Sequence, residues 1–299
     1  MPAIAAPMFL VSGPDLVVEA CRAGVIGTFP SLNQRSVAGY EAWLWEIEDR
    51  LNGNASARHG VNLIVHKTNE RLEADLDVTV RHRVPLVITS LGAVREVVDA
   101  IHSYGGVVFH DVIHLHHARK AAAAGVDGLI AVCAGAGGHA GTLNPFAFVA
   151  EIRAFFDKTV ILSGSITNGR QVAAAQLLGA DFAYLGTRFI NTQESLAAAA
   201  FKRMIVNSTA NDVVYTPAIS GVNANFLRAS IVAAGLDPDH LPPPATLRIN
   251  MDEEIKVWKH IWSAGHGVGD IHDIPTTADL CARLAREYQE AVASLATVS

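Results

Sequence analysis

Short apolar runs alternate with helix-length segments along the first 190 residues of the chain. Each of the eight runs has five to seven residues and is rich in Val, Ile, Leu and Ala. Such near-continuous apolar runs are typical of parallel strands that are covered on both faces. We therefore expect eight strands, over residues 3–9, 24–29, 60–65, 85–90, 106–112, 128–133, 159–164 and 182–186.

The segments between these runs have the length and the polar–apolar spacing of helices. Parallel pairing of successive strands requires a connection of about a dozen residues or more, usually a helix. Gly24, Gly125 and Gly179 each stand just before a strand, where glycine supplies the left-handed conformation that ends a helix. The predicted helices cover residues 14–22, 36–51, 68–82, 93–103, 114–124, 144–156 and 168–178.

Two stretches of the chain are near copies of one helix–strand unit. KAAAAGVDGLIAV (120–132) and AAAQLLGADFAYLG (173–186) both join an alanine-rich helix, a glycine, an aspartate and a strand. Eight such units favour a closed barrel, since a doubly wound open sheet more often has about five or six strands. No G-x-G-x-x-G sequence follows the first strand, which also disfavours the Rossmann fold. The pattern predicts a (β/α)8 TIM barrel of the α/β class.

The alternation stops after residue 190. Residues 220–244 have the pattern of helices joined by a proline-rich loop, and residues 251–262 have a helical pattern again. We expect residues 191–256 to form a helical elaboration over one mouth of the barrel. An amphipathic pattern over 276–296 predicts a final helix that packs back on the barrel. The predicted organisation is a barrel of residues 1–190, a helical substrate-side lid of residues 191–256 and C-terminal helices within residues 257–299.

Charge and cysteine content exclude several classes of protein. The net charge is −6 and no run of lysine and arginine occurs, whereas a nucleic-acid-binding protein normally carries a basic patch. No apolar run reaches the ~20 residues of a membrane span. Cys21, Cys133 and Cys281 are far apart and form neither a metal-binding spacing nor a disulfide framework. We expect a cytoplasmic protein, and its sequence is compatible with a homodimer.

Two loops at the predicted working end of the barrel favour a phosphate group. In this fold the active site lies at the C-terminal ends of the strands, and the loops after strands seven and eight often bind phosphate. Ser163-Gly164-Ser165-Ile166 follows the seventh strand and leads into a helix near Asn168, and Gly186-Thr187-Arg188 follows the eighth. Small residues allow close approach of the backbone, and helix starts attract anions. Tight turns without a ligand are the alternative.

The loop AGAGGHAG (134–141) after the sixth strand is the second candidate feature. Its small residues allow the backbone to run against a flat ligand while His139 projects into the barrel mouth. A histidine titrates near neutral pH and can accept a proton or stabilise an anion. The spacing alone is equally compatible with a solvated histidine in a glycine-rich turn.

With these motifs in this order, the chain resembles the nitronate monooxygenase family, formerly called 2-nitropropane dioxygenases. The resemblance is carried by APMF, GVNLIV, GVDGLIAVCAGAGGHAG, SGSITNGRQVAAAQLLGADFAYLGTRF and WSAGHGVG, which together extend over nearly the whole chain. It implies a barrel that binds FMN non-covalently and uses dioxygen to oxidise small alkyl nitronates, or the parent nitroalkanes, to a carbonyl compound and nitrite. The glycine-rich histidine loop is shared with the related FMN-dependent enoyl-ACP reductases.

The resemblance also implies which residues contact the flavin ring. Pro7 and Met8 would lie along the ring through their backbone, and Asn62 would hydrogen-bond its polar edge. Gly137 and Gly138 would pass close to the ring.

The remaining implied roles concern the phosphate and the reacting group. Backbone N–H groups of Gly164, Ser165, Gly186 and Thr187 would hold the FMN phosphate. Gly265 and Gly267 would approach the cofactor from the C-terminal segment. His139 matches the active-site histidine of the family, expected to act as a base toward neutral nitroalkanes or to bind the nitro group.

Three positions depart from the family pattern. Ser165 stands where many relatives have glycine, and a backbone donor survives that change. His266 stands where glutamine is frequent. Asp111 falls where some relatives carry a lysine near the flavin pyrimidine, and a carboxylate facing N1 would oppose an anionic reduced flavin.

The sequence leaves other functions open. An FMN-dependent NAD(P)H:quinone or enoyl-thioester reductase would share the fold and the phosphate site, and a non-catalytic flavin-binding module would share the cavity. Four tryptophans at helical spacings are expected to serve packing: Trp43, Trp45, Trp258 and Trp262.

A metal-dependent hydrolase is a further alternative. It would use a cluster made of His110, Asp111, His114, His116 and His117. Barrel metallohydrolases normally gather their ligands from several strand ends, whereas most of this cluster falls on one predicted helix. We therefore expect no metal.

Overall fold

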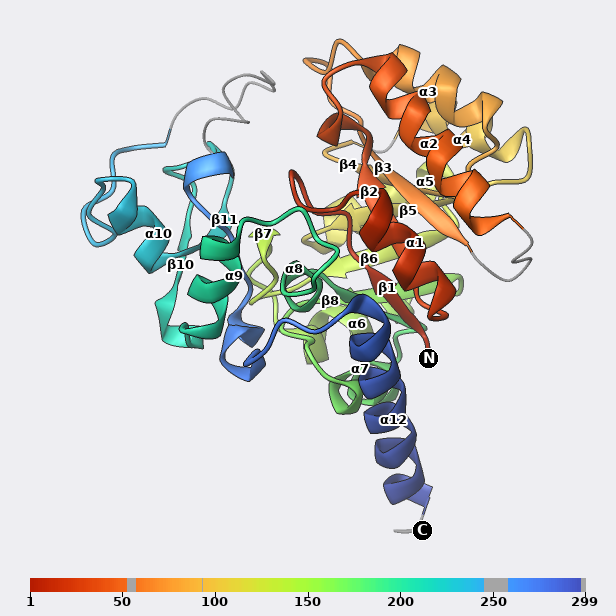
Figure 1. Cartoon of the computed structure of the whole chain (residues 1–299). Helices are drawn as coiled ribbons and strands as arrows, with labels where there is room; N and C mark the ends of the chain where they lie inside the picture. The colour runs from red at the N-terminus through yellow and green to blue at the C-terminus, as the bar shows by residue number, and fades with distance from the viewer. Residues whose placement is uncertain (53–57, 93, 245–257, 297–299) are drawn as a thin grey trace.

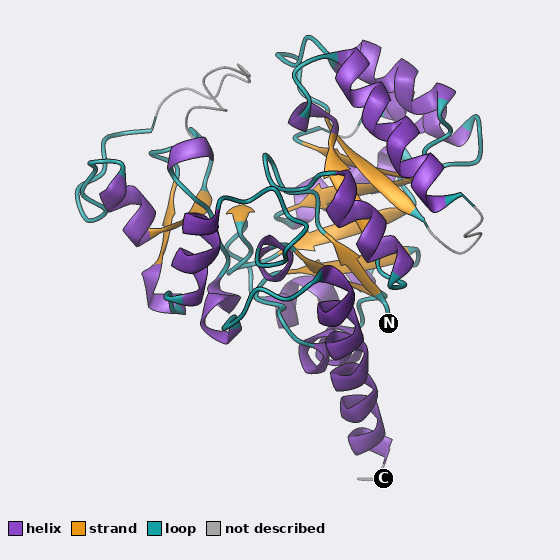
Figure 2. Cartoon of the chain, viewed as in Figure 1, coloured by secondary structure: helices purple, strands orange, loops and turns teal. Residues whose placement is uncertain are grey.

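The structure is a computed structural model that describes residues 1–52, 58–92, 94–244 and 258–296. Its centre is a closed barrel of parallel strands in the order β1-β2-β3-β4-β5-β6-β8-β9 (Figures 1 and 2). Pairing of β9 with β1, with Ala183 opposite Ala3, closes the ring. The strands are β1 (Ala3–Ala5), β2 (Ile26–Pro30), β3 (His59–Ile64), β4 (Leu86–Ser90), β5 (Val107–Val112), β6 (Gly128–Val132), β8 (Thr159–Ser163) and β9 (Phe182–Leu185). The predicted (β/α)8 barrel is confirmed.

Helices connect the strands and cover the outside of the barrel (Figure 2). Local sequence explains their ends: Pro14 occupies the first turn of α1, Gly125 ends α5 with a left-handed φ of 95°, and Asn168 with Gln171 forms a capping box on α7. The helices are α1 (Pro14–Arg22), α2 (Val37–Leu51), α3 (Leu72–Arg81), α4 (Arg95–His102), α5 (Leu115–Ala124), α6 (Pro145–Arg153) and α7 (Gly169–Leu177), with a 3₁₀ turn, η1 (Ser31–Asn33).

Alternating strand positions fill two apolar layers. One layer lies between the sheet and its helices and includes Leu129 and Ala131 of β6. The other lies inside the barrel and includes Ile130 and Val132 of the same strand, together with Phe109 of β5. This alternation follows from the two-residue period of a strand. It gives the barrel mouth a floor of packed side chains.

A lobe formed by residues 191–244 stands beside the barrel (Figure 1). It contains α9 (Ala199–Val206), η2 (Ala210–Asp212), β10 (Val213–Thr216), β11 (Ala224–Leu227) and α10 (Arg228–Ala233). The two strands were not predicted, because the sequence pattern was interpreted as helical throughout. They form an antiparallel sheet in the order β10-β11-β7, and β7 (Gly138–His139) comes from the glycine-rich loop of the barrel. Most of the helical pattern predicted over 251–262 lies outside the described residues.

The predicted helix over 276–296 is present as α12 (Thr277–Ala296) and packs against α7 and α1 (Figure 1). Tyr288 bonds through its hydroxyl to Oε1 of Gln176 at 2.5 Å. The carboxylate of Glu287 accepts a hydrogen bond from the backbone N–H of Gly169 at 2.8 Å. Two short segments precede α12: α8 (Thr187–Ile190), directly after β9, and η3 (His266–Asp270).

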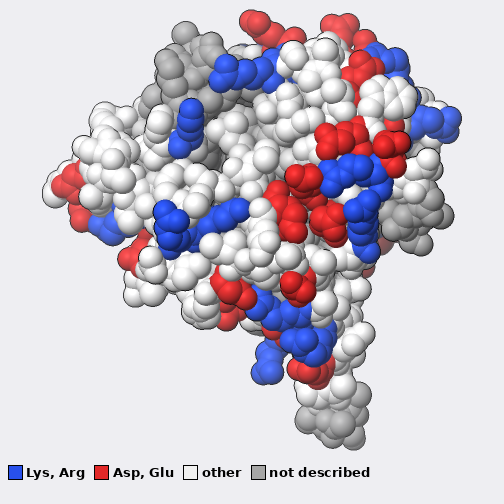
Figure 3. All heavy atoms as spheres, in the orientation of Figure 1, with Lys and Arg blue, Asp and Glu red and all other residues white. Residues whose placement is uncertain are grey.

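Charges of both signs are interspersed on the surface. Figure 3 shows Lys and Arg side chains next to Asp and Glu side chains, with broad uncharged areas between these groups. Arg50, for example, pairs with both Asp15 and Glu46. Within the described ranges, no helix combines the length and the apolar character that crossing a bilayer requires.

Candidate active site

A cavity of about 910 Å³ opens at the carboxyl ends of the barrel strands, lined by both the barrel and the lobe. Ligand sites of small-molecule enzymes are commonly concave spaces of roughly this size. All twelve residues that the sequence predicted for the site line this one cavity: Pro7, Met8, Asn62, Gly137, Gly138, His139, Gly164, Ser165, Gly186, Thr187, Gly265 and Gly267. The structure therefore brings the predicted residues together, while the role of each stays a prediction.

His139 is held on a strand and not in a free loop. β7 pairs antiparallel with β11, so that His139 lies opposite Ala224 and Gly138 opposite Asn225. Backbone pairing fixes the direction of the histidine side chain, because successive side chains of a strand point to opposite faces. The alternative of a solvated loop histidine is therefore disfavoured.

Buried polar groups brace the glycine-rich loop from behind. The backbone N–H of Gly138 donates to Oγ of Ser263 at 2.6 Å, and that hydroxyl donates to the carbonyl of Asn225 at 2.5 Å. The side-chain amide of Asn225, which is 1% exposed, donates to the carbonyl of Ala136 at 2.6 Å. Buried hydrogen-bonded networks of this kind fix one geometry, because each unpaired group would be costly.

The imidazole of His139 has apolar surroundings. Its Nε2 is buried without a hydrogen-bond partner among the described residues, and its ring meets the edge of Trp258 at a centroid distance of 5.6 Å. Burial lowers the pKa of His139 to about 4. The ring is therefore neutral at physiological pH. Trp258, predicted as a packing residue, also lines the cavity.

The loops after β8 and β9 form one corner of the cavity. The structure records no acceptor among the described residues for the backbone N–H groups of Gly164, Ser165 and Gly186. Ser165 adopts a left-handed φ of 57°, a conformation that glycine adopts more easily. Thr187 accepts a hydrogen bond at Oγ1 from the N–H of Gly265 at 2.9 Å. This corner can present several N–H groups to an anion.

The start of α7 does not contribute such groups, contrary to the interpretation of the helix near Asn168 as an anion site. The N–H of Gln171 donates to Oδ1 of Asn168, and the N–H of Asn168 donates to Oε1 of Gln171. The N–H of Gly169 donates to Glu287 of α12. Side chains of the protein thus satisfy the helix start, and the anion-binding capacity rests on the loops alone.

Gly265 stands where two loops approach closely. A Cβ atom at Gly265 would lie 2.4 Å from the carbonyl oxygen of Gly135 and 2.9 Å from the backbone N of Gly137. No side chain fits at that distance. The C-terminal segment therefore lies directly against the glycine-rich loop, which gives a structural reason for these glycines beside any contact with a ligand.

A polar group occupies the opposite side of the cavity, at the ends of β3, β4 and β5. The side-chain amide of Asn62 donates to the carbonyl of Ile88 at 3.1 Å and to Oγ of Ser90 at 2.7 Å. Ser90 in turn donates to Oδ2 of Asp111 at 2.6 Å. Since the nitrogen of Asn62 is engaged, its carbonyl oxygen is the atom available to a ligand.

The first strand's loop forms a wall of the cavity. Pro7 and Met8 line it, and the backbone of Met8 is already engaged, its N–H with Ser12 and its carbonyl with Asn33. These bonds hold the loop rigidly against the cavity. His266, by contrast, is exposed and does not line the cavity, although its N–H bonds to the carbonyl of Gly135.

Several cavity residues were not predicted. Arg35, Lys120 and Lys259 are exposed at the cavity wall, and the structure records no carboxylate partner for them among the described residues. They come from distant segments, so no spacing in the sequence could indicate that they meet. The wall is therefore cationic on a protein whose net charge is −6.

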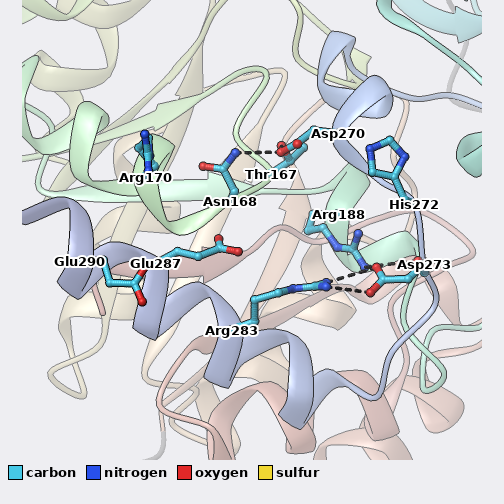
Figure 4. A pocket seen from close by; sticks show the side chains of 10 residues that line it. All are labelled: Thr167, Asn168, Arg170, Arg188, Asp270, His272, Asp273, Arg283, Glu287 and Glu290. Carbon is cyan, nitrogen blue, oxygen red and sulfur yellow. Dashed lines mark hydrogen bonds and ion pairs between the residues drawn. The ribbon is translucent and has the colours of Figure 1, made fainter.

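A second, polar hollow of about 370 Å³ lies between α7, η3 and α12 (Figure 4). Figure 4 shows Asp273 between Arg188 and Arg283, with Oδ1 3.0 Å from Arg188 and Oδ2 2.7 Å from Arg283. Asp270 accepts hydrogen bonds from Thr167 and Asn168. These charged side chains are paired with one another, and the hollow therefore serves to attach α12.

The histidines and the aspartate that the alternative of a metal-dependent hydrolase would use do not converge among the described residues. Across the described ranges, no three His, Cys, Asp or Glu side chains converge as metal ligands would. His114 instead caps α5, since its Nδ1 accepts from the N–H of His117 at 3.3 Å. His110 bonds through Nδ1 to the hydroxyl of Thr89 at 2.7 Å.

Comparison with known families shows which family the chain resembles. A family model described as nitronate monooxygenase matches residues 32–287. The nitronate monooxygenase of Paraburkholderia phytofirmans is 32% identical over 203 residues, which cover 61% of this chain and 54% of that protein. The chain spans about half the length of the curated relatives it matches first.

Two solved structures share the architecture. Nitroalkane oxidase from Streptomyces ansochromogenes has a TM-score of 0.80 at 26% identity, with 99% of this chain and 97% of that chain covered. FabK from Thermotoga maritima has a TM-score of 0.82 at 23% identity, with 100% and 96% covered. The second likeness supports the barrel fold alone.

Proposed function

The chain belongs to the nitronate monooxygenase family, and from this premise we propose that it is an FMN-dependent enzyme that uses dioxygen to oxidise alkyl nitronates to a carbonyl compound and nitrite. The observation that carries the proposal is a single cavity that joins a neutral histidine, a corner of free backbone N–H groups and a polar group on the far side.

The cavity has one region that suits the phosphate of FMN and another that suits its ring. The corner formed by Gly164, Ser165 and Gly186 presents N–H groups of the kind that bind a phosphate. The ring would extend from there across the barrel mouth, because the corner at β8 and β9 lies on the opposite side of the barrel from β3 and β4. Asn62 and Ser90 would then meet the polar pyrimidine edge.

FMN, when bound, supplies the electron-accepting ring, and the protein supplies position and electrostatics. His139 would hydrogen-bond to the oxygens of a nitronate. An anion beside the imidazole raises its pKa, so the ring would take up a proton only in the complex. In the protein without a ligand, the imidazole of His139 has a pKa of about 4 and is therefore a weak base. A nitronate, which has already lost its proton, therefore suits this site better than a neutral nitroalkane.

The cysteines agree with the cytoplasmic setting that we include in the proposal. Cys21, Cys133 and Cys281 are buried and free. Burial raises the pKa of the Cys133 thiol to about 12, which keeps it protonated and unreactive. Nothing in their placement calls for an oxidising compartment.

Replacement of His139 tests the proposal. Purified protein is expected to be yellow and to release about one equivalent of FMN on denaturation. His139→Ala is expected to retain FMN and to lose about 10²–10³-fold in kcat/KM for an alkyl nitronate, measured as nitrite formed, because the hydrogen-bond donor to the nitronate oxygens is removed. Arg286→Gln, on the exposed face of α12, is the matched control and should behave as wild type. A colourless protein that does not bind added FMN would refute the proposal.

A second candidate is supported by the cationic wall. Arg35, Lys120 and Lys259 would suit the phosphates of NADH or NADPH, as an FMN-dependent reductase requires. Anaerobic mixing of the FMN-loaded protein with each nucleotide separates the two candidates. Rapid bleaching of the flavin favours the reductase, and an unchanged spectrum together with aerobic nitrite release favours the monooxygenase.

A further inference from the structure

Asp111 lies at the floor of the cavity, near the end of β5. It has the same orientation on the strand as Phe109, two residues earlier, whose side chain belongs to the apolar layer inside the barrel. The carboxyl group therefore stands at the top of that layer and faces the cavity, which it lines. A charged side chain at this place needs a physical explanation, because its lower neighbours are apolar.

Only one oxygen of this carboxyl group has a partner. Oδ2 accepts from the hydroxyl of Ser90 at 2.6 Å, and Ser90 is itself held by the amide of Asn62. Oδ1 is buried and has no hydrogen-bond partner among the described residues. An orphaned oxygen at the wall of a ligand cavity is available to a ligand, because buried polar atoms are normally hydrogen-bonded.

No cation neutralises Asp111 among the described residues. Tyr184 of β9 interacts electrostatically with Asp111, His110 precedes it on the same strand, and His139 of β7 lines the same cavity. His110 turns toward Thr89, and burial lowers its pKa to about 4. On α5, His117 and Lys120 contribute to the lowered pKa of His110. The pKa of Asp111 is set by burial and by its hydrogen bond with Ser90.

Burial makes the carboxylate form of Asp111 less favourable than it is in water. Burial raises the pKa of Asp111 to about 6, with the Ser90 hydrogen bond acting in the opposite direction. A flat ring laid over the carboxyl group would remove the remaining water and would favour the neutral acid further. The neutral acid carries one O–H, which needs an acceptor.

We propose that Asp111 is a protonated carboxylic acid in the FMN-bound protein and that its O–H donates a hydrogen bond to an acceptor on the pyrimidine edge of the ring. The inference rests on FMN binding as proposed above. A protonated Asp111 would be a neutral donor at the place where negative charge gathers when the ring is reduced. The like-charge repulsion expected from an ionised aspartate there would then be absent.

The proposal couples FMN binding to one proton. If FMN binds the protonated form of Asp111, binding draws a proton from solvent and the Kd rises with pH above the pKa of the free protein, which is about 6. The increase is about tenfold per pH unit until the pKa of the complex is reached. Below about pH 6 Asp111 contributes no further change to the Kd, because it is already protonated.

The test is the Kd of FMN, measured by quenching of its fluorescence between about pH 5 and 9. We expect the Kd of the wild type to rise at least about tenfold between pH 6 and 8. Asp111→Asn, which is always neutral and still a donor, should lose this rise in the Kd of FMN above about pH 6. Ser90→Ala, which loses the bond that stabilises the carboxylate, should shift the onset of the rise to higher pH.

A matched control is Asp77→Asn, the same chemical change on the exposed face of α3, which should keep the wild-type pH dependence. The difference infrared spectrum on FMN binding at neutral pH should contain the carbonyl band of a protonated carboxyl group in the wild type and lack it in Asp111→Asn. A flat wild-type profile, or an unchanged slope in Asp111→Asn, overturns this inference alone. Absence of FMN binding overturns the proposed function with it.

Discussion

His59 and His110 are buried and His139 is partly buried, and the three have different surroundings. His110 has a hydroxyl partner, whereas Nε2 of His59 and Nε2 of His139 have none among the described residues. Burial lowers the pKa of each to about 4. At the scale of the residue, the cavity histidine and the purely structural one at the start of β3 thus have the same electrostatic character. What distinguishes His139 is the space that it lines and not its pKa.

The depressed pKa values predict loss of stability in acid. A histidine that is neutral when folded and has a pKa near 6.5 when unfolded binds its proton only in the unfolded state between about pH 4 and 6.5. The free energy of unfolding should therefore rise with pH through this window, by up to about 1.4 kcal/mol per pH unit for each histidine. Above about pH 6.5 these groups should contribute no further dependence.

The variant His59→Leu tests the contribution of one histidine to this pH dependence, at a position outside the cavity. Its urea-unfolding free energy should rise less steeply with pH than that of the wild type, by the equivalent of one proton, between pH 4.5 and 6.5. Trp45, which is exposed and 63% accessible, offers a control: Trp45→Leu should keep the wild-type slope. Equal slopes in His59→Leu and the wild type would contradict the assignment.

The individual site residues could be predicted where a strand end or a glycine-rich loop marks them in the sequence. His139 and Gly186 are of this kind, because the alternation of apolar runs and helical segments locates the strand ends along the chain. Lys259 and Trp258 could not be predicted, since a lone residue in a segment far from the barrel strands gives no local signal. Their presence at the cavity depends on tertiary packing.

At the scale of the element, prediction succeeded where local rules agree. Helix α1 was expected over 14–22 and is observed as Pro14–Arg22, because proline suits its first turn and Gly24 follows its end. β7 was not expected, since two residues show no periodicity. The strands β10 and β11 were also not predicted, because the sheet that they form with β7 depends on residues far apart in the chain.

The attachment of α12 depends on Asp273. Its carboxylate joins Arg283 of α12 to Arg188 of α8, whose side chain is only 2% exposed. Asp273→Ala would leave a buried guanidinium without its counter-charge, and we expect a loss of about 1–3 kcal/mol, reduced from the fully buried case because Asp273 is 44% exposed. Chemical denaturation measures the loss, and hydrogen exchange should become faster in α12.

A double variant tests the cause of that loss. Replacing Arg188 with Met in the Asp273→Ala background removes the unpaired charge and should recover part of the stability. Arg286→Ala, whose exposed pair with Glu290 spans 4.0 Å, should change stability by less than about 0.5 kcal/mol. If Asp273→Ala is as mild as Arg286→Ala, the attachment does not depend on this ion pair.

At the scale of the whole molecule, the cavity is built from segments that span nearly the entire chain, from Ala6 to Gly267. The three segments predicted from the sequence, residues 1–190, 191–256 and 257–299, all precede or follow one another along the chain. That they are separate domains stays a prediction. A ligand that contacts all three parts should stabilise them together.

Bound FMN is accordingly expected to raise the thermal stability of the chain as one unit. At a free FMN concentration of one hundred times its Kd, the gain is about 2.7 kcal/mol, or roughly 4 °C in Tm for a chain of this length. Differential scanning fluorimetry with increasing FMN measures it, and riboflavin, which lacks the phosphate, should give a smaller shift. An FMN effect no larger than that of riboflavin would argue against the phosphate corner at β8 and β9.

The pairing of β7 with β11 and the contact of Gly265 with the glycine-rich loop also set an order of assembly. All eight barrel strands precede β11 and residue 265 in the order of synthesis. A nascent chain that has not yet reached them lacks both the partner strand of His139 and the segment that lies against the glycine-rich loop. The wall of the cavity is therefore completed late in translation.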